Sequence, residues 1–220
     1  MIFLLVTGAL LVWDLDHPER FWMVLTRPQW RSWLVRGGFI ITGYGGILAL
    51  HLGAVIGGRP EIPQSLSWVG GPLAAMTAIY TAYLFAQAKA RDLWQSPLLP
   101  PHLLVQALLA GSATLILLNP DGLGVGAVWI LKASLAVHLI LALGEVSMPH
   151  PTAHAALAAR NMTRGAYAAF YWGGIALTAA SLLLVGTSDT IGALGALAGL
   201  AGLFLHEHAY VQAGQSVPLA

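Results

Sequence analysis

Long apolar runs alternate with short polar connections along the whole 220-residue sequence. Glycine, proline and charged residues mark the ends of these runs, and the unbroken apolar lengths predict seven membrane segments. In chain order we expect them at residues 2–13, 32–57 and 66–88, from Pro100–Pro101 to Asn119–Pro120, and at 123–145, 167–185 and 191–210. Because the connections are short, successive segments should be antiparallel neighbours.

The first run differs from the others in length. It holds only a dozen apolar residues, whereas a helix that crosses a membrane needs about 20. It lacks the basic start and the small-residue cleavage site of a signal peptide. We interpret residues 2–13 as the second half of a span whose beginning is missing; the alternative is a short, half-buried helix packed against its neighbours.

The composition agrees with this pattern. Charged residues make up 9% of the chain, hydrophobic residues 57%, and the mean hydropathy is +0.74. Since a soluble domain has about 25% charged residues, we predict an all-α, multi-pass membrane helix bundle that forms a single integral membrane domain, 1–220. A net charge of +1 argues against nucleic acid as a partner. The chain has no cysteine, so it carries no iron–sulfur cluster or disulfide of its own.

Basic residues in the connections predict the orientation of the chain in the membrane. The connections after the first, third and fifth segments share one side of the membrane, and the opposite side carries only Arg59. By the positive-inside rule, the side with more basic residues is cytoplasmic. Its basic residues are Arg20, Arg27, Arg31, Lys89, Arg91, Arg160 and Arg164.

Ionisable and phenolic residues inside the spans are the candidate functional residues, because burying them in lipid costs roughly 2.5–3.5 kcal/mol on insertion scales. A bound quinone needs hydrogen-bond partners, and quinol oxidation releases protons that titratable groups must carry to an aqueous face. The quinone-binding candidates are Tyr80, His138, Tyr44 and His51. The proton-relay candidates are Arg36, Lys132, Glu145 and Asp14. Each of them is also suited to a plain hydrogen bond between helices.

These residues leave two other functions open. A haem b anchor needs two histidines at matched depth, but His51 and His138 differ in depth, which leaves His102 with His206 near one surface. A small-solute transporter should show an internal repeat with interrupted spans at matched positions. We find no clear repeat in this sequence.

The connection DLDHPERFWMVLTRPQWRSW, residues 14–33, concentrates charge and aromatic rings between two apolar runs. Its tryptophans suit an aromatic belt at the lipid headgroups. The alternative is that Pro18 ends the preceding helix and residues 19–27 form a short amphipathic helix. In that helix Phe21, Trp22, Val24 and Leu25 would dip into the interface.

Four motifs carry a family resemblance over essentially the whole chain. They are D-L-x-x-P-x-R-F from Asp14, S-W-L-x-R-G from Ser32, Y-T-A-x-L-F-A from Tyr80 before W-x-S-P-L-L-P, and the tail A-G-Q-S-V-P-L. With them the sequence resembles the NrfD-type family, the membrane subunit of polysulfide reductase and related respiratory molybdoenzymes. This resemblance implies a bundle of eight or more transmembrane helices, so a first helix would be absent here.

The resemblance also implies cofactors and partners. Such subunits bind menaquinone or ubiquinone without haem, so we expect no haem or metal in this chain. They exchange electrons with a ferredoxin-like iron–sulfur subunit, which connects to a molybdopterin catalytic subunit, in the bacterial inner membrane. Tyr80 matches the family tyrosine placed at the quinone, and Arg36 matches a family arginine. Which face receives the iron–sulfur partner stays open.

Overall fold

The computed structural model describes residues 2–59, 61–118 and 125–218, and within these ranges it is all-α, as predicted. The chain forms two compact units, Met1–Gln87 (unit 1) and Ala88–Ala220 (unit 2), which are described separately. The predicted span boundaries at Asn119–Pro120 and Leu123 lie outside the described residues. The expectation of a single membrane domain stays a prediction.

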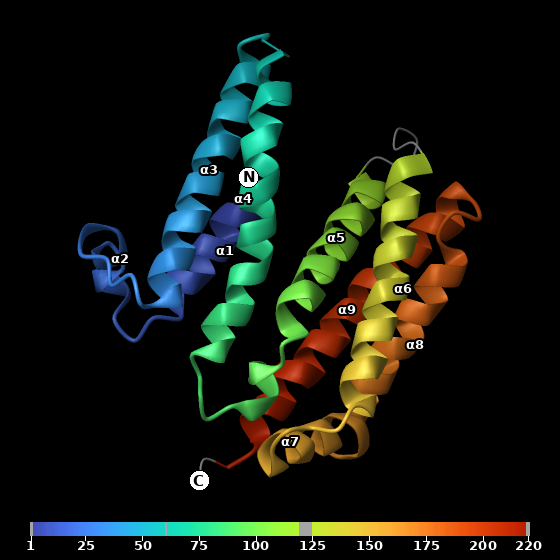
Figure 1. The fold of residues 1–220 in the computed structure, drawn as a ribbon. Helices are drawn as coiled ribbons and strands as arrows, with labels where there is room; N and C mark the ends of the chain where they lie inside the picture. Colours follow the sequence, from blue (N-terminus) through green and yellow to red (C-terminus); the bar gives the residue numbers. More distant parts are fainter. Residues whose placement is uncertain (1, 60, 119–124, 219–220) are drawn as a thin grey trace. The chain divides into compact units, whose positions relative to one another are not determined.

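Unit 1 is built on an antiparallel pair of long helices, drawn in blue and teal in Figure 1. The turn between them uses Gly58, whose φ of +68° lies in the left-handed region that glycine adopts without a Cβ clash. The elements of unit 1 are α1 (Ile2–Trp13), η1 (Pro18–Arg20), α2 (Met23–Thr26), α3 (Trp33–Ile56) and α4 (Glu61–Ala86).

Unit 2 packs four membrane-length or apolar helices around a buried core, with a short amphipathic helix across one end (Figure 1). Its closest pair is α8 and α9, where a Cβ on Gly202 would lie 2.9 Å from the carbonyl oxygen of Gly174. Small residues at such a crossing let two backbones approach closely in lipid. The elements of unit 2 are η2 (Asp92–Gln95), α5 (Leu99–Leu118), α6 (Val125–Ser147), α7 (Ala153–Arg164), α8 (Ala168–Leu184) and α9 (Asp189–Ser216).

Among the described residues, five helices are long and apolar enough to cross a membrane: α3, α4, α5, α6 and α9. A sixth candidate is the pair α7 and α8, which is bent by 68° at a short break. With the short apolar α1, these correspond to the seven predicted segments, and the protein is a multi-pass membrane protein. The sequence pattern did not predict α7, whose residues 153–164 alternate polar and small apolar side chains.

The connection at residues 14–33 differs from the amphipathic-helix interpretation of it, and the aromatic belt stays a prediction. Helix α1 already ends at Trp13, and Pro18 begins the 3-10 turn η1 instead of ending a helix, because its fixed φ suits the first position of a helical turn. The continuous helix predicted at residues 19–27 is therefore wrong. It is divided into η1 and the single turn α2, separated by Phe21 and Trp22.

Candidate functional site

An apolar cavity of about 610 Å³ lies inside unit 1, between α1, α2 and α3, with Tyr80 of α4 in its wall. This volume is in the range of small-molecule pockets, which are typically about 300–1,000 Å³. Of the lining residues, only Thr42 and Tyr80 carry a side-chain hydroxyl. Thr42 donates its hydroxyl to the backbone oxygen of Gly38 at 2.7 Å. The cavity thus offers hydrocarbon walls and one phenol.

Tyr80 is held in this wall by a close helix crossing. Its side chain is only 5% exposed, and its ring packs against Gly37 of α3. A Cβ at position 37 would fall well inside van der Waals distance of two ring carbons and 3.2 Å from the ring's Cζ. The glycine in S-W-L-x-R-G and the tyrosine in Y-T-A-x-L-F-A are therefore one packing unit, although 43 residues separate them in the sequence.

The connection after α1 supplies another wall of the cavity. Phe21, Val24 and Leu25 line it, so these side chains contact other parts of the protein. Helix α1 has no buried residue and contributes leucines such as Leu4 and Leu11 from its inner side. An apolar ring with a hydrocarbon tail fits such a lining, because no charged group has to be desolvated to bind it.

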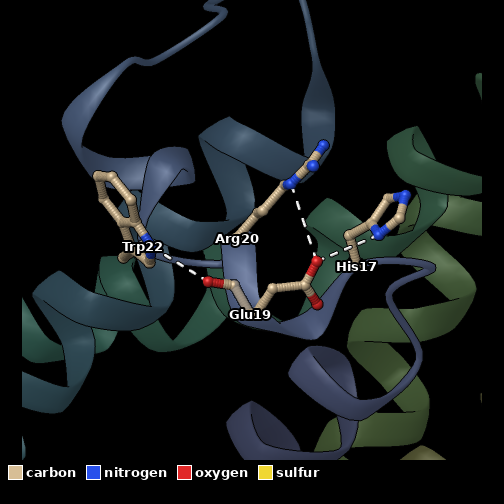
Figure 2. A network of polar contacts seen from close by, with 4 residues as sticks. All are labelled: His17, Glu19, Arg20 and Trp22. Carbon is tan, nitrogen blue, oxygen red and sulfur yellow. Dashed lines mark hydrogen bonds and ion pairs between the residues drawn. The ribbon is translucent and has the colours of Figure 1, made fainter.

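A small polar network fixes the start of this connection, as Figure 2 shows. The carboxylate of Glu19 lies 3.2 Å from Nδ1 of His17 and 3.8 Å from Nε of Arg20. The indole N–H of Trp22 donates to the backbone oxygen of Glu19 at 3.0 Å. These groups are exposed, so the ion pairs add little stability. Their effect is to hold the backbone of η1 in place before Phe21.

Arg36, a predicted relay residue, is engaged with aromatic residues of the same connection. Its Nε donates to the backbone oxygen of Trp30 at 2.7 Å, and its guanidinium lies 4.7 Å from the ring of Trp33. Trp33 also stacks on Tyr83 at 4.4 Å between ring centroids. This geometry anchors the start of α3 to α4. A relay role for Arg36 stays a prediction.

The other predicted residues of unit 1 lie outside the cavity lining. Tyr44 and His51 are half-buried on α3, and neither belongs to the described wall. Asp14 is exposed and lines a shallow depression on α1 with Thr7 and Trp13. Of the predicted quinone-binding residues in this unit, Tyr80 is the one that the structure places at a cavity.

Unit 2 contains a cluster of three buried histidines, which we call the histidine triad: His102 of α5, His138 of α6 and His206 of α9. They are 2%, 0% and 1% exposed. Their ring centroids lie 4.8–5.3 Å apart. Nε2 of His102 is hydrogen-bonded to Nδ1 of His138 at 2.9 Å. The rings contact one another directly, which differs from the two opposed axial ligands, one on each face of a porphyrin, that the haem b alternative requires.

The two remaining relay candidates lie in opposite halves of α6. Lys132 is half-buried, and its Nζ would lie 3.5 Å from a Cβ on Gly186, which puts it at the turn between α8 and α9. Glu145 is 5% exposed and lies beside the hydroxyl groups of Ser96 and Tyr210. It also lines a cavity of about 280 Å³ near η2 and α7. The structure therefore does not bring Lys132 and Glu145 together.

The sequence pairs His102 with His206 and places His138 at a different depth in the membrane. In that prediction each residue's depth is counted from the end of its predicted span. His138 and His206 lie nine and ten residues before the ends of α6 and α9, whereas His102 lies three residues after the start of α5. At about 1.5 Å per residue, α5 begins some 10 Å inside the level at which α6 and α9 end. The sequence signal for this offset is the run W-x-S-P-L-L-P, which begins at the end of η2, continues through an irregular stretch and enters the first turn of α5.

Comparison with known proteins agrees with the helical architecture. The chain is 24% identical over 184 residues to a protein of Halobacterium salinarum whose name is that of a dimethyl sulfoxide reductase membrane subunit. The match covers 69% of this chain and 42% of that relative, so the chain spans less than half of the relative's length. No solved structure matches the chain. The model of the family described as "Polysulphide reductase, NrfD" matches residues 1–219, and the chain therefore belongs to the NrfD polysulphide reductase family.

Proposed function

We propose that this protein is the quinone-reactive membrane anchor subunit of a respiratory oxidoreductase complex. It would exchange electrons between the quinol pool and an iron–sulfur partner. Membership of the NrfD family and the similarity to a protein named as a reductase membrane subunit support the class of complex. The apolar cavity with Tyr80 in its wall is the observation that carries the quinone part of the proposal.

The chemistry of the cavity suits a quinone. A quinone is a flat ring with two carbonyl oxygens and a long isoprenoid tail, so it needs apolar walls and a few hydrogen-bond partners. The phenol of Tyr80 supplies such a partner and, being buried against Gly37, is held in one orientation. An oriented donor at a ring oxygen favours the charge that develops there as electrons and protons leave.

The electrons must leave through a partner, because the chain has no cysteine to ligate an iron–sulfur cluster. On this proposal a ferredoxin-like iron–sulfur subunit receives them and passes them to a molybdopterin catalytic subunit. The quinone is menaquinone or ubiquinone, and the complex sits in a bacterial plasma membrane. His138, Tyr44 and His51 remain candidates for further quinone contacts, and Asp14, Arg36, Lys132 and Glu145 for proton transfer.

Replacing Tyr80 with Phe tests the role of the phenol while keeping the ring that packs on Gly37. We expect the quinol turnover of the assembled complex to fall about tenfold, which corresponds to the loss of one hydrogen bond of about 1.4 kcal/mol. The level of inserted protein should be unchanged. Tyr83→Phe, one turn later on the same helix, is the matched control, because Tyr83 is 37% exposed and is not part of the cavity wall.

A fluorescent quinol analogue gives a second measurement that does not need the partner subunits. The purified chain should bind it, and Leu25→Trp, which fills the cavity, should weaken binding while Tyr83→Phe leaves it unchanged. If Tyr80→Phe turns over quinol at the wild-type rate and Leu25→Trp binds the analogue normally, this cavity is not the quinone site.

A further inference from the structure

The histidine triad of unit 2 is unusual because three imidazole side chains converge in the core with few hydrogen-bond partners. A neutral imidazole carries one donor and one acceptor nitrogen. In the triad only His102 and His138 are joined by a hydrogen bond. Nε2 of His138 and Nδ1 of His206 are buried and have no partner among the described residues. Leaving a buried polar atom unsatisfied costs about 1–3 kcal/mol, so the cluster is incomplete as a hydrogen-bonded unit.

The three side chains are arranged as a ligand set. One nitrogen from each ring lies within 4.8 Å of the other two, and one pair is already 2.9 Å apart. Three nitrogens bound to one ion at about 2.0–2.1 Å would be some 3.3 Å apart in a tetrahedral site. Binding a common ion therefore requires the most distant pair of nitrogens to approach by up to about 1.5 Å. The ligands come from three helices, and α5 packs against both α6 and α9 in the bundle (Figure 1).

We propose that His102, His138 and His206 bind one transition-metal ion of the zinc and copper class, which ties α5, α6 and α9 together. Imidazole ligands suit these ions and not Mg²⁺ or Ca²⁺, which prefer oxygen. Three protein ligands leave one coordination position for water or another small ligand. This proposal revises the expectation from sequence of a chain without a metal.

Further polar side chains lie near the triad, toward the end of α6. Glu145 follows His138 by seven residues, so both lie on one face of α6, about 10 Å apart along the helix. Glu145 lines the cavity near η2 and α7, together with Asp92 and His150, and such groups attract cations. Between them Tyr210 lies beside Glu145 and stacks on His206 at 6.3 Å between ring centroids. Polar side chains therefore continue from the triad toward the end of α6 at which Glu145 lies.

Metal content of the full-length purified chain tests the proposal. After loading with Zn²⁺ or Cu²⁺ and removal of excess ion, elemental analysis should find about one ion per chain. Since losing even a partner of a ligand typically costs 10–100-fold in affinity, His138→Ala and His206→Ala should each lower the bound ion at least tenfold. His208→Ala is the matched control, because His208 packs against Phe170 from the same helix as His206, outside the triad.

A second measurement avoids the risk that a histidine variant fails to fold. X-ray absorption of the loaded wild-type protein should show imidazole ligands at the distances expected for a bound zinc or copper ion. Loading should raise the thermal unfolding temperature of the wild type, and a chelator should reverse the shift. Comparing zinc-loaded with copper-loaded samples tells which ion the site retains.

The proposal is overturned if the loaded wild-type chain holds less than about a tenth of an ion, or if His138→Ala and His206→Ala retain as much as His208→Ala. A Soret band with two histidine ligands would overturn it too, since the iron would then belong to haem. Metal content is read without quinol turnover, and Tyr80→Phe, which lies in unit 1, should lower turnover while leaving metal content unchanged. His206→Ala is the decisive variant for the metal, because His138 is also a candidate quinone contact.

Discussion

Gly37→Ala is the most direct test of the packing that positions Tyr80. The added Cβ would meet two ring carbons of Tyr80 well inside the ordinary carbon–carbon contact of about 3.5–4.0 Å. The ring must therefore move by roughly 1 Å, and overpacking of this kind typically costs about 1–3 kcal/mol. Alanine regains about 0.5–1 kcal/mol over glycine inside a helix. The net expected loss of stability is about 1–2 kcal/mol.

The same displacement should also lower turnover. Moving the phenol by about 1 Å can lose at most what removing it loses, so we expect quinol turnover of the Gly37→Ala complex to fall by up to the tenfold expected for Tyr80→Phe. Stability is measured by thermal unfolding of the purified chain in detergent, and turnover in the assembled complex. Gly46→Ala is the control, because on the same helix its Cβ would meet nothing within 4 Å.

A double variant separates the clash from other effects of the alanine. Tyr80→Leu removes the ring atoms that a Cβ at position 37 would strike, so adding Gly37→Ala to it should cost no further stability. Such non-additivity is expected only for residues in contact. The reasoning is refuted if Gly37→Ala behaves like Gly46→Ala in both stability and turnover, or if the two substitutions are simply additive.

Three further substitutions test how unit 2 is held together, each measured by thermal unfolding in detergent. Gly202→Ala should cost about 2 kcal/mol or more, because its Cβ would strike the backbone of α8 at 2.9 Å, whereas Gly111→Ala, with nothing within 4 Å, should be neutral or stabilising. Arg91→Ala should cost about 1–2 kcal/mol, since its Nη1 donates to two carbonyl oxygens at the end of α9, at 2.8 and 2.9 Å; unchanged stability would show these bonds to be dispensable. Thr152→Ala should cost about 1 kcal/mol, because its hydroxyl caps the start of α7; retention of wild-type stability, with Thr152→Ser as the control, would contradict that role.

The number and position of the helices follow from the sequence because unbroken apolar length is a local property. Each predicted span has a helix or bent pair of helices at its place, and the family motif around Tyr80 pointed to a residue that does line a cavity. The cavity itself was not predictable, since it depends on α1, the connection after it and α3 coming together. No local pattern in the sequence encodes that convergence.

The same limit explains why the sequence did not predict the histidine triad or α7. Counting residues to obtain depth assumes that all helices start at the same level, and α5 does not. Helix α7 has a mixed composition that is not apolar enough to be recognised as a span and was assigned to a connection. Its four buried residues, Ala155, Ala158, Ala159 and Met162, recur three or four positions apart, which is the helical signal that was available.

The bend between α7 and α8 has a consequence for the lipids around unit 2. Helix α8 has 17 residues and α9 has 28, so at about 1.5 Å per residue they span some 25 Å and 42 Å. The hydrocarbon core of a bilayer is about 30 Å thick. Where lipid touches α8, the bilayer must thin by several ångströms, or the headgroups must settle onto α7 beside it. We expect this hydrophobic mismatch to make the protein prefer thinner bilayers, and to concentrate short-chain lipids along the α8 face.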